Sequence, residues 1–174
     1  METNFFEKNK KLLIVLAVVL VLVLWVVGKY NSFVKQNEAI TGAWAQVENQ
    51  LQRRFDLIPN IVSTVKGVTQ QEKDVIGQLA DARTRYAGAT TTDEKAVAAG
   101  GVESSFARLL VIVENYPQLK SSESFRDLTV ELEGTENRIS VERMKYNELV
   151  KSLNANIKMF PNSVLASIFG VKER

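Results

Sequence analysis

Histidine and cysteine are both absent from this chain of 174 residues. The absence of histidine removes the commonest general base, and with it the Ser-His and Cys-His nucleophile systems and most zinc sites. The absence of cysteine excludes disulfides, thiolate ligands and lipid-modified cysteines, although it is compatible with either side of a membrane. A glycine-rich phosphate-binding loop is also missing. We therefore expect no enzymatic activity, no cofactor, no metal ion and no catalytic residue.

Residues 30–174 carry no excess of positive or negative charge. The first 29 residues hold four of the 22 basic and two of the 20 acidic side chains, so 18 of each remain in residues 30–174. Nucleic-acid binding depends on a basic surface that releases counterions, whereas here both signs alternate along the chain. We therefore expect no nucleic-acid partner.

A long hydrophobic run is present near the N-terminus. After a short polar tail, residues 1–11, sixteen apolar residues follow without interruption from Leu12 to Val27. As a helix they span roughly 24 Å at ~1.5 Å per residue, close to the thickness of a hydrocarbon core. We predict a transmembrane helix over residues 12–28. The residues expected at the membrane interface are Lys11, Trp25, Lys29 and Tyr30.

A cleaved signal peptide is the alternative for this segment, because it shares the charged start and the apolar run. No A-x-A-like site follows the run, and its length exceeds the usual ~7–15 residues of a signal peptide's apolar region, which favours an uncleaved anchor. Lysines on the N-terminal side outnumber those that follow closely, which favours a cytoplasmic N-terminus and a domain outside the membrane.

Sustained alternation of apolar and polar residues is missing, so no β-sheet is expected. Apolar residues instead recur every seven positions, as on one face of a helix. One such row comprises Ile40, Val47, Arg54, Ile61 and Val68, in which only Arg54 is charged. A second comprises Phe125, Leu132, Ile139, Tyr146, Leu153 and Phe160.

These rows predict an all-α fold: one N-terminal transmembrane helix, then an antiparallel bundle of about four helices over residues 30–160, with long first and last helices. The expected helices are Tyr30 to about Val68, Glu72–Ala89, Val102–Tyr116 and Glu123–Phe160. No strong breaker separates Gly28 from Trp44, so we expect the anchor to continue directly into the first bundle helix. Residues 88–101, small, polar and bounded by glycines, predict a flexible loop.

An antiparallel register for the two long helices follows if Tyr30 lies near Phe160. Arg54 then lies beside Glu136, and Trp44 lies beside Tyr146. The C-terminal residues 161–174 return toward the membrane end, where two interpretations stay open. They form either a membrane-proximal interfacial helix or the closing base of the bundle.

Charged residues gather in two stretches, QRRFDLIPN and ELEGTENRISVER. A lone charge such as Arg54 in an apolar row is costly to bury without a carboxylate partner, which favours a buried ion network. Its expected members are Arg53, Arg54, Asp56, Glu136, Arg138, Glu142 and Arg143. The alternative is a ligand- or metal-binding site that uses Arg53, Arg54 and Glu136.

At these stretches the chain resembles the LemA family of bacterial membrane-anchored helical proteins. The matching runs are YNSFV, AWAQVENQLQRRFDLIPNIVSTVKG, Ala82-Arg83, VENYPQLKSSESF, LEGTENRISVERMKYN and FPNSVLASIFG, which together cover most of residues 30–170. Family members often carry a histidine where this chain has GVTQQEK. The resemblance implies a helical bundle behind one transmembrane segment of a bacterial cell membrane, and no established activity, substrate or cofactor.

Two hypotheses of function follow. The first is a non-enzymatic scaffold or adaptor of the bacterial cell envelope, whose partners are the lipid bilayer, further copies of itself and an unidentified membrane or envelope protein. The second is an envelope sensor that binds a ligand or metal at the Arg53, Arg54 and Glu136 region.

Overall fold

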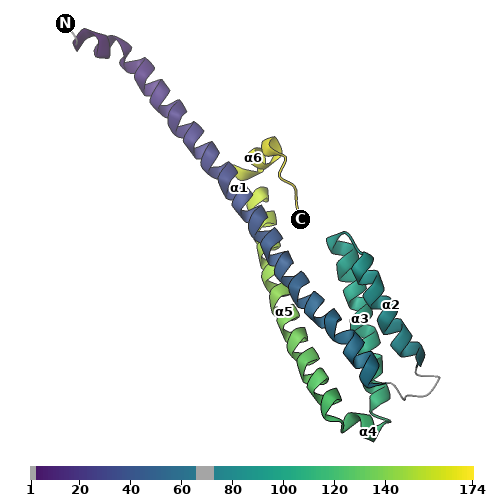
Figure 1. Ribbon diagram of the computed structural model, residues 1–174. Helices are drawn as coiled ribbons and strands as arrows, with labels where there is room; N and C mark the ends of the chain where they lie inside the picture. The colour runs from purple at the N-terminus through teal and green to yellow at the C-terminus, as the bar shows by residue number, and fades with distance from the viewer. Residues whose placement is uncertain (1–2, 66–72) are drawn as a thin grey trace. The chain divides into compact units, whose positions relative to one another are not determined.

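The computed structural model of the chain describes residues 3–65 and 73–174, and these residues contain helices and no β-strand (Figure 1). The helices are α1 (Thr3–Thr64), α2 (Lys73–Gly88), α3 (Thr92–Val113), α4 (Pro117–Lys120), α5 (Glu123–Lys158) and α6 (Asn162–Phe169). The predicted all-α fold with long first and last bundle helices is confirmed. The short helices α4 and α6 add to the four that were expected. The predicted helix ends at Val68 and Glu72 lie outside the described residues.

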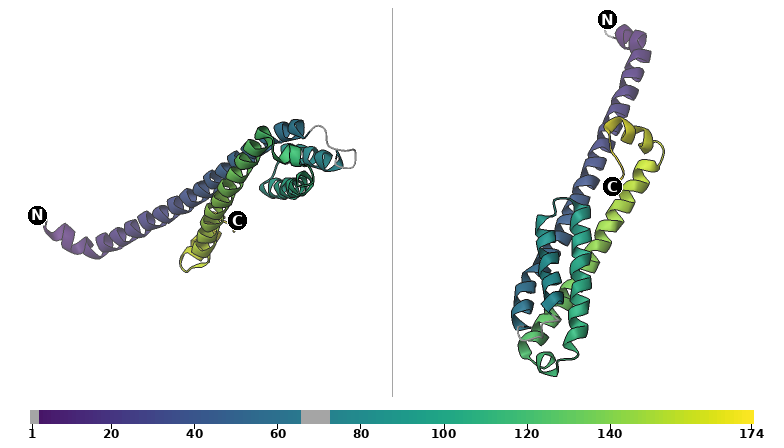
Figure 2. Two further views of the ribbon diagram at one scale, coloured as in Figure 1. Left: turned by 90° about the horizontal axis from the view of Figure 1, so that it is seen from below. Right: turned by 90° about the vertical axis from the view of Figure 1, so that its right-hand side faces the viewer.

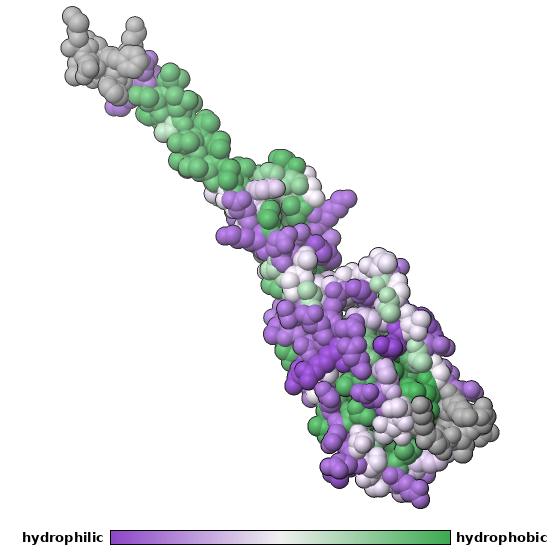
Figure 3. Space-filling model, in the orientation of Figure 1, coloured by the Kyte–Doolittle hydropathy of each residue, from purple (hydrophilic) through white to green (hydrophobic). Residues whose placement is uncertain are grey.

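Helix α1 is continuous over 62 residues, so the apolar run and the first bundle helix form one helix, as predicted. From Leu12 to Val27 nearly all the large apolar side chains are exposed, and Figure 3 shows this stretch as an apolar surface. By length and composition α1 and α3 both qualify as membrane-spanning helices, but the apolar window of α1 has no buried residue, whereas a third of the α3 window is buried. The apolar surface of α1 therefore lacks a protein partner within the described part of the chain, whereas α3 belongs to a protein core.

The chain divides into two compact units, each of which contains parts of α1 and α5. We call Met1–Trp44 with Met144–Arg174 the stalk unit, and Ala45–Arg143 the bundle unit. The same two long helices therefore supply core residues to both units.

The stalk unit is held by an antiparallel pair of helices and by α6. Its core comprises Phe33, Ile40, Leu153, Ile157 and Ala166, with Tyr146, Leu149, Val150, Leu165, Phe169 and Val171 packed against it. The rings of Trp44 and Tyr146 lie 5.3 Å apart, so the predicted register is confirmed at this pair. Helix α5 ends at Lys158, and Phe160 is exposed rather than part of the predicted apolar row.

The bundle unit packs α1, α2, α3 and α5 around one core, with α2 and α3 side by side (Figures 1 and 2). Its fully buried large side chains include Leu51, Phe55, Ile61, Leu79, Leu109 and Ile139. The Phe55 and Tyr86 rings lie 3.9 Å apart and join α1 to α2. A Cβ added at Gly101 would lie 3.9 Å from the Ala82 Cβ, so α2 and α3 approach closely at small residues.

The predicted flexible loop over residues 88–101 is wrong, because α3 begins at Thr92 and only residues 89–91 separate it from α2. Thr91 caps α3: its hydroxyl accepts a hydrogen bond from the Glu94 N–H, and the Glu94 carboxylate accepts one from the Thr91 N–H. This reciprocal capping satisfies backbone donors at the helix start. Burial of Ala99 and Val102 offsets the low helix propensity of Gly100 and Gly101.

Candidate functional site

Arg54 is the most buried charged residue of the described chain and the centre of the candidate site. It lies on α1, in the same row as buried Val47 and Ile61, because residues seven apart share a helix face. Its side chain is only 7% exposed, whereas those of Glu103 and Glu136 are 33% and 46% exposed. The guanidinium is therefore enclosed by the protein, while its carboxylate partners reach toward solvent.

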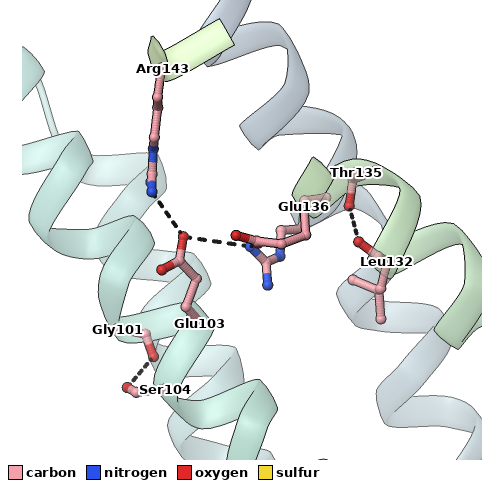
Figure 4. Close-up of polar contacts among 8 residues, drawn as sticks. Gly101, Glu103, Ser104, Leu132, Thr135, Glu136 and Arg143 are labelled. Carbon is pink, nitrogen blue, oxygen red and sulfur yellow. Dashed lines mark hydrogen bonds and ion pairs between the residues drawn. The ribbon is translucent and has the colours of Figure 1, made fainter. Parts of the chain in front are cut away.

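An ion cluster of Arg54, Glu103, Glu136 and Arg143 joins α1, α3 and α5. The Arg54 Nη1 donates a hydrogen bond to Glu136 Oε2 and lies 3.6 Å from Glu103 Oε1. The same Glu103 oxygen lies 3.2 Å from the Arg143 Nη1, and Figure 4 shows Arg143 pointing toward Glu103 across the gap between their helices. Two positive and two negative side chains make the cluster neutral.

Two buried atoms of the ion cluster have no hydrogen-bond partner: Arg54 Nε and Glu103 Oε1. Nearby polar groups are satisfied within their own helices. The buried Thr135 hydroxyl donates to the Leu132 carbonyl at 2.7 Å, and the Ser105 hydroxyl donates to the Gly101 carbonyl at 2.9 Å. Each hydroxyl donates its one hydrogen to a carbonyl of the preceding turn, so neither can donate a hydrogen bond to the ion cluster.

The structure brings together Arg54, Glu136 and Arg143 of the expected network in the ion cluster. The ion pair of Arg54 with Glu136 agrees with the antiparallel register. Glu142 is half-buried and interacts with another residue.

Three members of the expected buried network are exposed, and including them was wrong. Arg53 pairs with Glu131 at the surface, Asp56 accepts a hydrogen bond from Gln52, and Arg138 is exposed. Neighbours one or two positions from Arg54 or Glu136 point elsewhere, because each residue of an α-helix turns by ~100°.

Sequence reasoning missed Glu103, which links both arginines. It also missed the pair of Lys95 on α3 with Glu48 on α1. Lys95, on α3, lies within the predicted loop, which hid its direction. Glu103 lies in the predicted helix over Val102–Tyr116, but outside the two stretches in which charged residues gather. The capping pattern of Thr91 and Glu94 was the signal that marks the true start of this helix.

Chemically, the ion cluster is suited to join helices rather than to react. Both carboxylates face guanidinium groups, and no nucleophile lies in the cluster. Among the residues that the structure describes, no group of three or more acidic side chains is placed to hold a metal ion.

Among the residues that the structure describes, Tyr86 and Glu94 lie outside the ion cluster and have shifted pKa values. Burial, and then the charge of Glu48, raise the pKa of the Tyr86 phenol. Hydrogen bonds from the Thr90 N–H and then the Thr91 N–H lower the pKa of the Glu94 carboxyl. Both shifts have structural causes, in a core contact and in a helix cap.

A surface groove of about 860 Å³ lies along α2 and α3 in the bundle unit. Its lining includes Gln78 and Arg108, which bond to each other, and Glu94, which caps α3. These polar groups serve the helices that carry them.

The residues predicted at the membrane interface lie around the C-terminal end of the apolar stretch, apart from Lys11 at its start. Trp25 and Tyr30 are exposed, and the Lys29 Nζ lies 5.8 Å from the centre of the Trp25 ring. The Tyr30 ring meets the Phe169 ring of α6 edge to face at 5.1 Å. An aromatic and basic group beside an apolar stretch is typical of a membrane boundary.

Comparison with known proteins gives relatives of one kind. Magnetosome proteins MamQ 2 and MamQ 1 of Paramagnetospirillum magneticum are each 26% identical to this chain over 170 residues, and MamQ of Magnetospirillum gryphiswaldense is 25% identical. Each match covers 83% of this chain and 62% of the relative, so the chain spans less than two thirds of their length.

The family comparison covers the whole bundle unit and the α5 and α6 part of the stalk unit. The model of the LemA family matches residues 43–174, which include the ion cluster, all of α2 to α6 and the part of α1 that enters the bundle unit. With most of its length matched, and with the helical architecture just described, this chain belongs to the LemA family.

Proposed function

We propose that the protein is a membrane-anchored, non-enzymatic helical scaffold or adaptor of the bacterial cell envelope. The observation that carries the proposal is the exposed apolar stretch of α1, which continues in one helix into residues that pack in both units. Exposed apolar surface of this size is costly in water, and a helix of this composition and length suits a bilayer. Similarity to the magnetosome proteins supports membrane association.

The anchor crosses the membrane once in this proposal, with the N-terminus in the cytoplasm. The bundle unit and the part of the stalk unit that follows the apolar stretch lie outside. Lysines on the N-terminal side of the apolar stretch support this orientation.

The adaptor role rests on exposed apolar side chains of the long helix α5. Val130, Val141 and Met144 are exposed and share one side of that helix, as their spacings of eleven and three residues require. They offer contacts to a second copy or to another envelope protein. The neutral ion cluster fixes the helices that carry this surface.

Membrane anchoring is tested with charged substitutions in the full-length chain. Leu20→Asp with Leu24→Asp places two carboxylates in the apolar stretch, at a cost of roughly 3 kcal/mol each in a bilayer centre. The variant should leave the membrane fraction, whereas Val97→Asp, at an exposed site of α3, should remain in it. Retention of both variants in the membrane would contradict anchoring through α1.

Adaptor function is tested by crosslinking in cells, since the chain has no cysteine of its own. Val141→Cys should give crosslinked homo-oligomers or mixed products with membrane proteins. Asn147→Cys is the matched control: it is exposed on the same helix, and six residues at ~100° each turn it by about 120° from Val141. Equal labelling without products at both positions, together with a monomer in mild detergent, would count against the proposal.

Ligand sensing is the second candidate, favoured by the unpartnered Arg54 Nε. It is less well supported, because Glu103 and Glu136 already neutralise the guanidinium and Arg53 faces solvent. Phosphate or Mg²⁺ should raise the melting temperature by mass action if a site exists. An unchanged melting temperature across both ligands would remove this candidate.

A further inference from the structure

Helix α6 is exposed to solvent on one side although its sequence, NSVLASIF, contains no charged residue. Val164 and Ile168 are 52% and 70% exposed, and Phe160, just before the helix, is 84% exposed. Positions 164 and 168 lie on one side of the helix, because residues four apart are neighbours on its surface. This outer side of α6 is apolar without a covering segment in the described chain.

The opposite side of α6 is firmly attached to the stalk unit. Ala166 is buried in the stalk core, and Leu165 and Phe169 pack against that core. Gly170 ends the helix in the left-handed conformation, at φ 68°, and donates its N–H to the Ala166 carbonyl. Ile168 is therefore exposed although the helix that carries it is packed against the stalk core.

Polar contacts fix both ends of the segment as well. The Asn162 Nδ2 donates to Asn156 Oδ1 at 2.6 Å at the start of α6. Beyond its end, the Arg174 N–H donates to Asn154 Oδ1 at 3.1 Å, and the Arg174 Nη2 donates to Asn37 Oδ1 at 2.9 Å. Helix α6 therefore has a defined position on the stalk helices.

That position is the end of the apolar stretch of α1, beside which Figures 1 and 2 show α6. The contact of Phe169 with Tyr30 fixes the position of α6 along α1. Tyr30 follows Val27, the last residue of the apolar stretch, by only three positions. Three residues advance a helix by roughly 4.5 Å, which is less than the depth of a headgroup region. If α1 spans the bilayer, α6 lies at its surface.

We propose that α6 is an interfacial membrane anchor, which inserts Phe160, Val164 and Ile168 among the lipids at the level of Tyr30. Lys172 follows it and suits anionic headgroups, whereas the Lys158 Nζ pairs with Glu173 Oε2 at 2.9 Å. The proposal rests on the proposed function, because it requires α1 in the membrane. Lipid is the occupant because the patch adjoins the apolar stretch, and because three side chains are far less than the ~800 Å² per partner of a stable protein interface.

The test uses the full-length chain in phosphatidylcholine and phosphatidylglycerol vesicles, with one cysteine labelled by an environment-sensitive fluorophore. Ile168→Cys reports on α6, Lys151→Cys is an exposed control on α5 of the same unit, and Val19→Cys reports on the apolar stretch. Lipids brominated near the carbonyl should quench the fluorophore at Ile168 and leave it unchanged at Lys151. Val164→Cys serves as a second probe of the same surface. Lipids brominated near the end of the acyl chain should quench the fluorophore at Val19, which lies in the middle of the apolar stretch.

The outcomes separate the two proposals. Quenching at Val19 with none at Ile168 and Val164 overturns the interfacial anchor and leaves the membrane-spanning helix intact. The absence of quenching at all positions overturns both. Protection of Ile168 from aqueous iodide without quenching by brominated lipid assigns the surface to a protein contact and also overturns the proposal.

Discussion

Replacement of Arg54 by alanine tests how the bundle unit holds its ion cluster. The change removes the one buried charge that touches both Glu103 and Glu136. Breaking a fully buried pair costs about 3–5 kcal/mol, whereas an exposed pair contributes less than about 1 kcal/mol. Since both carboxylates are partly exposed and can regain water, we expect Arg54→Ala to lower the free energy of unfolding by about 2–3 kcal/mol.

The neighbouring residue provides the matched control. Arg53→Ala removes the same atoms from the same helix, but its pair with Glu131 is exposed, so the loss should stay below about 1 kcal/mol. Arg54→Met separates charge from packing, because it keeps much of the side chain's volume within the core. It should recover part of the stability lost in Arg54→Ala.

Urea unfolding of the full-length chain in mild detergent, followed by far-UV circular dichroism, measures these differences. A double-mutant cycle of Arg54→Ala with Glu136→Ala isolates the pair. Equal losses for Arg53→Ala and Arg54→Ala, or a loss below about 1 kcal/mol for both, would refute the assignment of Arg54 to a buried pair.

Three further predictions concern pH and topology. The hydrogen bond from the Thr90 N–H is the main cause of the lowered pKa of the Glu94 carboxyl. The lowered pKa stabilises the fold at pH values above the unfolded pKa of 4.5, and this stabilisation is lost as the pH falls through the folded pKa. Acid titration of unfolding should therefore show less loss in Glu94→Gln, and identical curves would contradict this. Burial raises the pKa of Tyr86, so stability is complete below pH 10.0 and falls as the pH rises, because the unfolded phenol ionises first. Tyr86→Phe should reduce the alkaline loss, and an unchanged slope would show that the phenol is hydrated in the fold. An impermeant thiol reagent on intact cells should label Val97→Cys and spare Thr3→Cys, and the reverse pattern would place the bundle unit in the cytoplasm.

The two long helices could be predicted from the sequence because their apolar rows are long and regular. The apolar row from Phe125 to Leu153 predicted the start of α5 correctly. The antiparallel register predicted the contacts of Trp44 with Tyr146 and of Arg54 with Glu136. Both contacts were predicted from helical periodicity together with the assumed pairing of Tyr30 with Phe160, since one pair sets the register of two antiparallel helices.

The start of α3 could not be predicted from apolar periodicity, because its first turns are built from small residues. Gly100 and Gly101 look like loop residues by propensity, yet Gly101 suits the close contact with Ala82 on α2. Glu103 was missed for a different reason: it lies in the predicted helix over Val102–Tyr116, away from the two charged stretches in which partners of Arg54 were expected. Tertiary packing decided the conformation where local propensity was weak.

The order in which the chain is made has a consequence for the stalk core. Phe33 and Ile40 leave the ribosome first, whereas their partners Leu153, Ile157 and Ala166 follow more than a hundred residues later. Such long-range closure slows folding and leaves apolar side chains of the nascent chain uncovered. Loss of residues 165–174 would remove five of the eight residues of α6, and Phe33 and Ile40 would lose the cover that this helix provides.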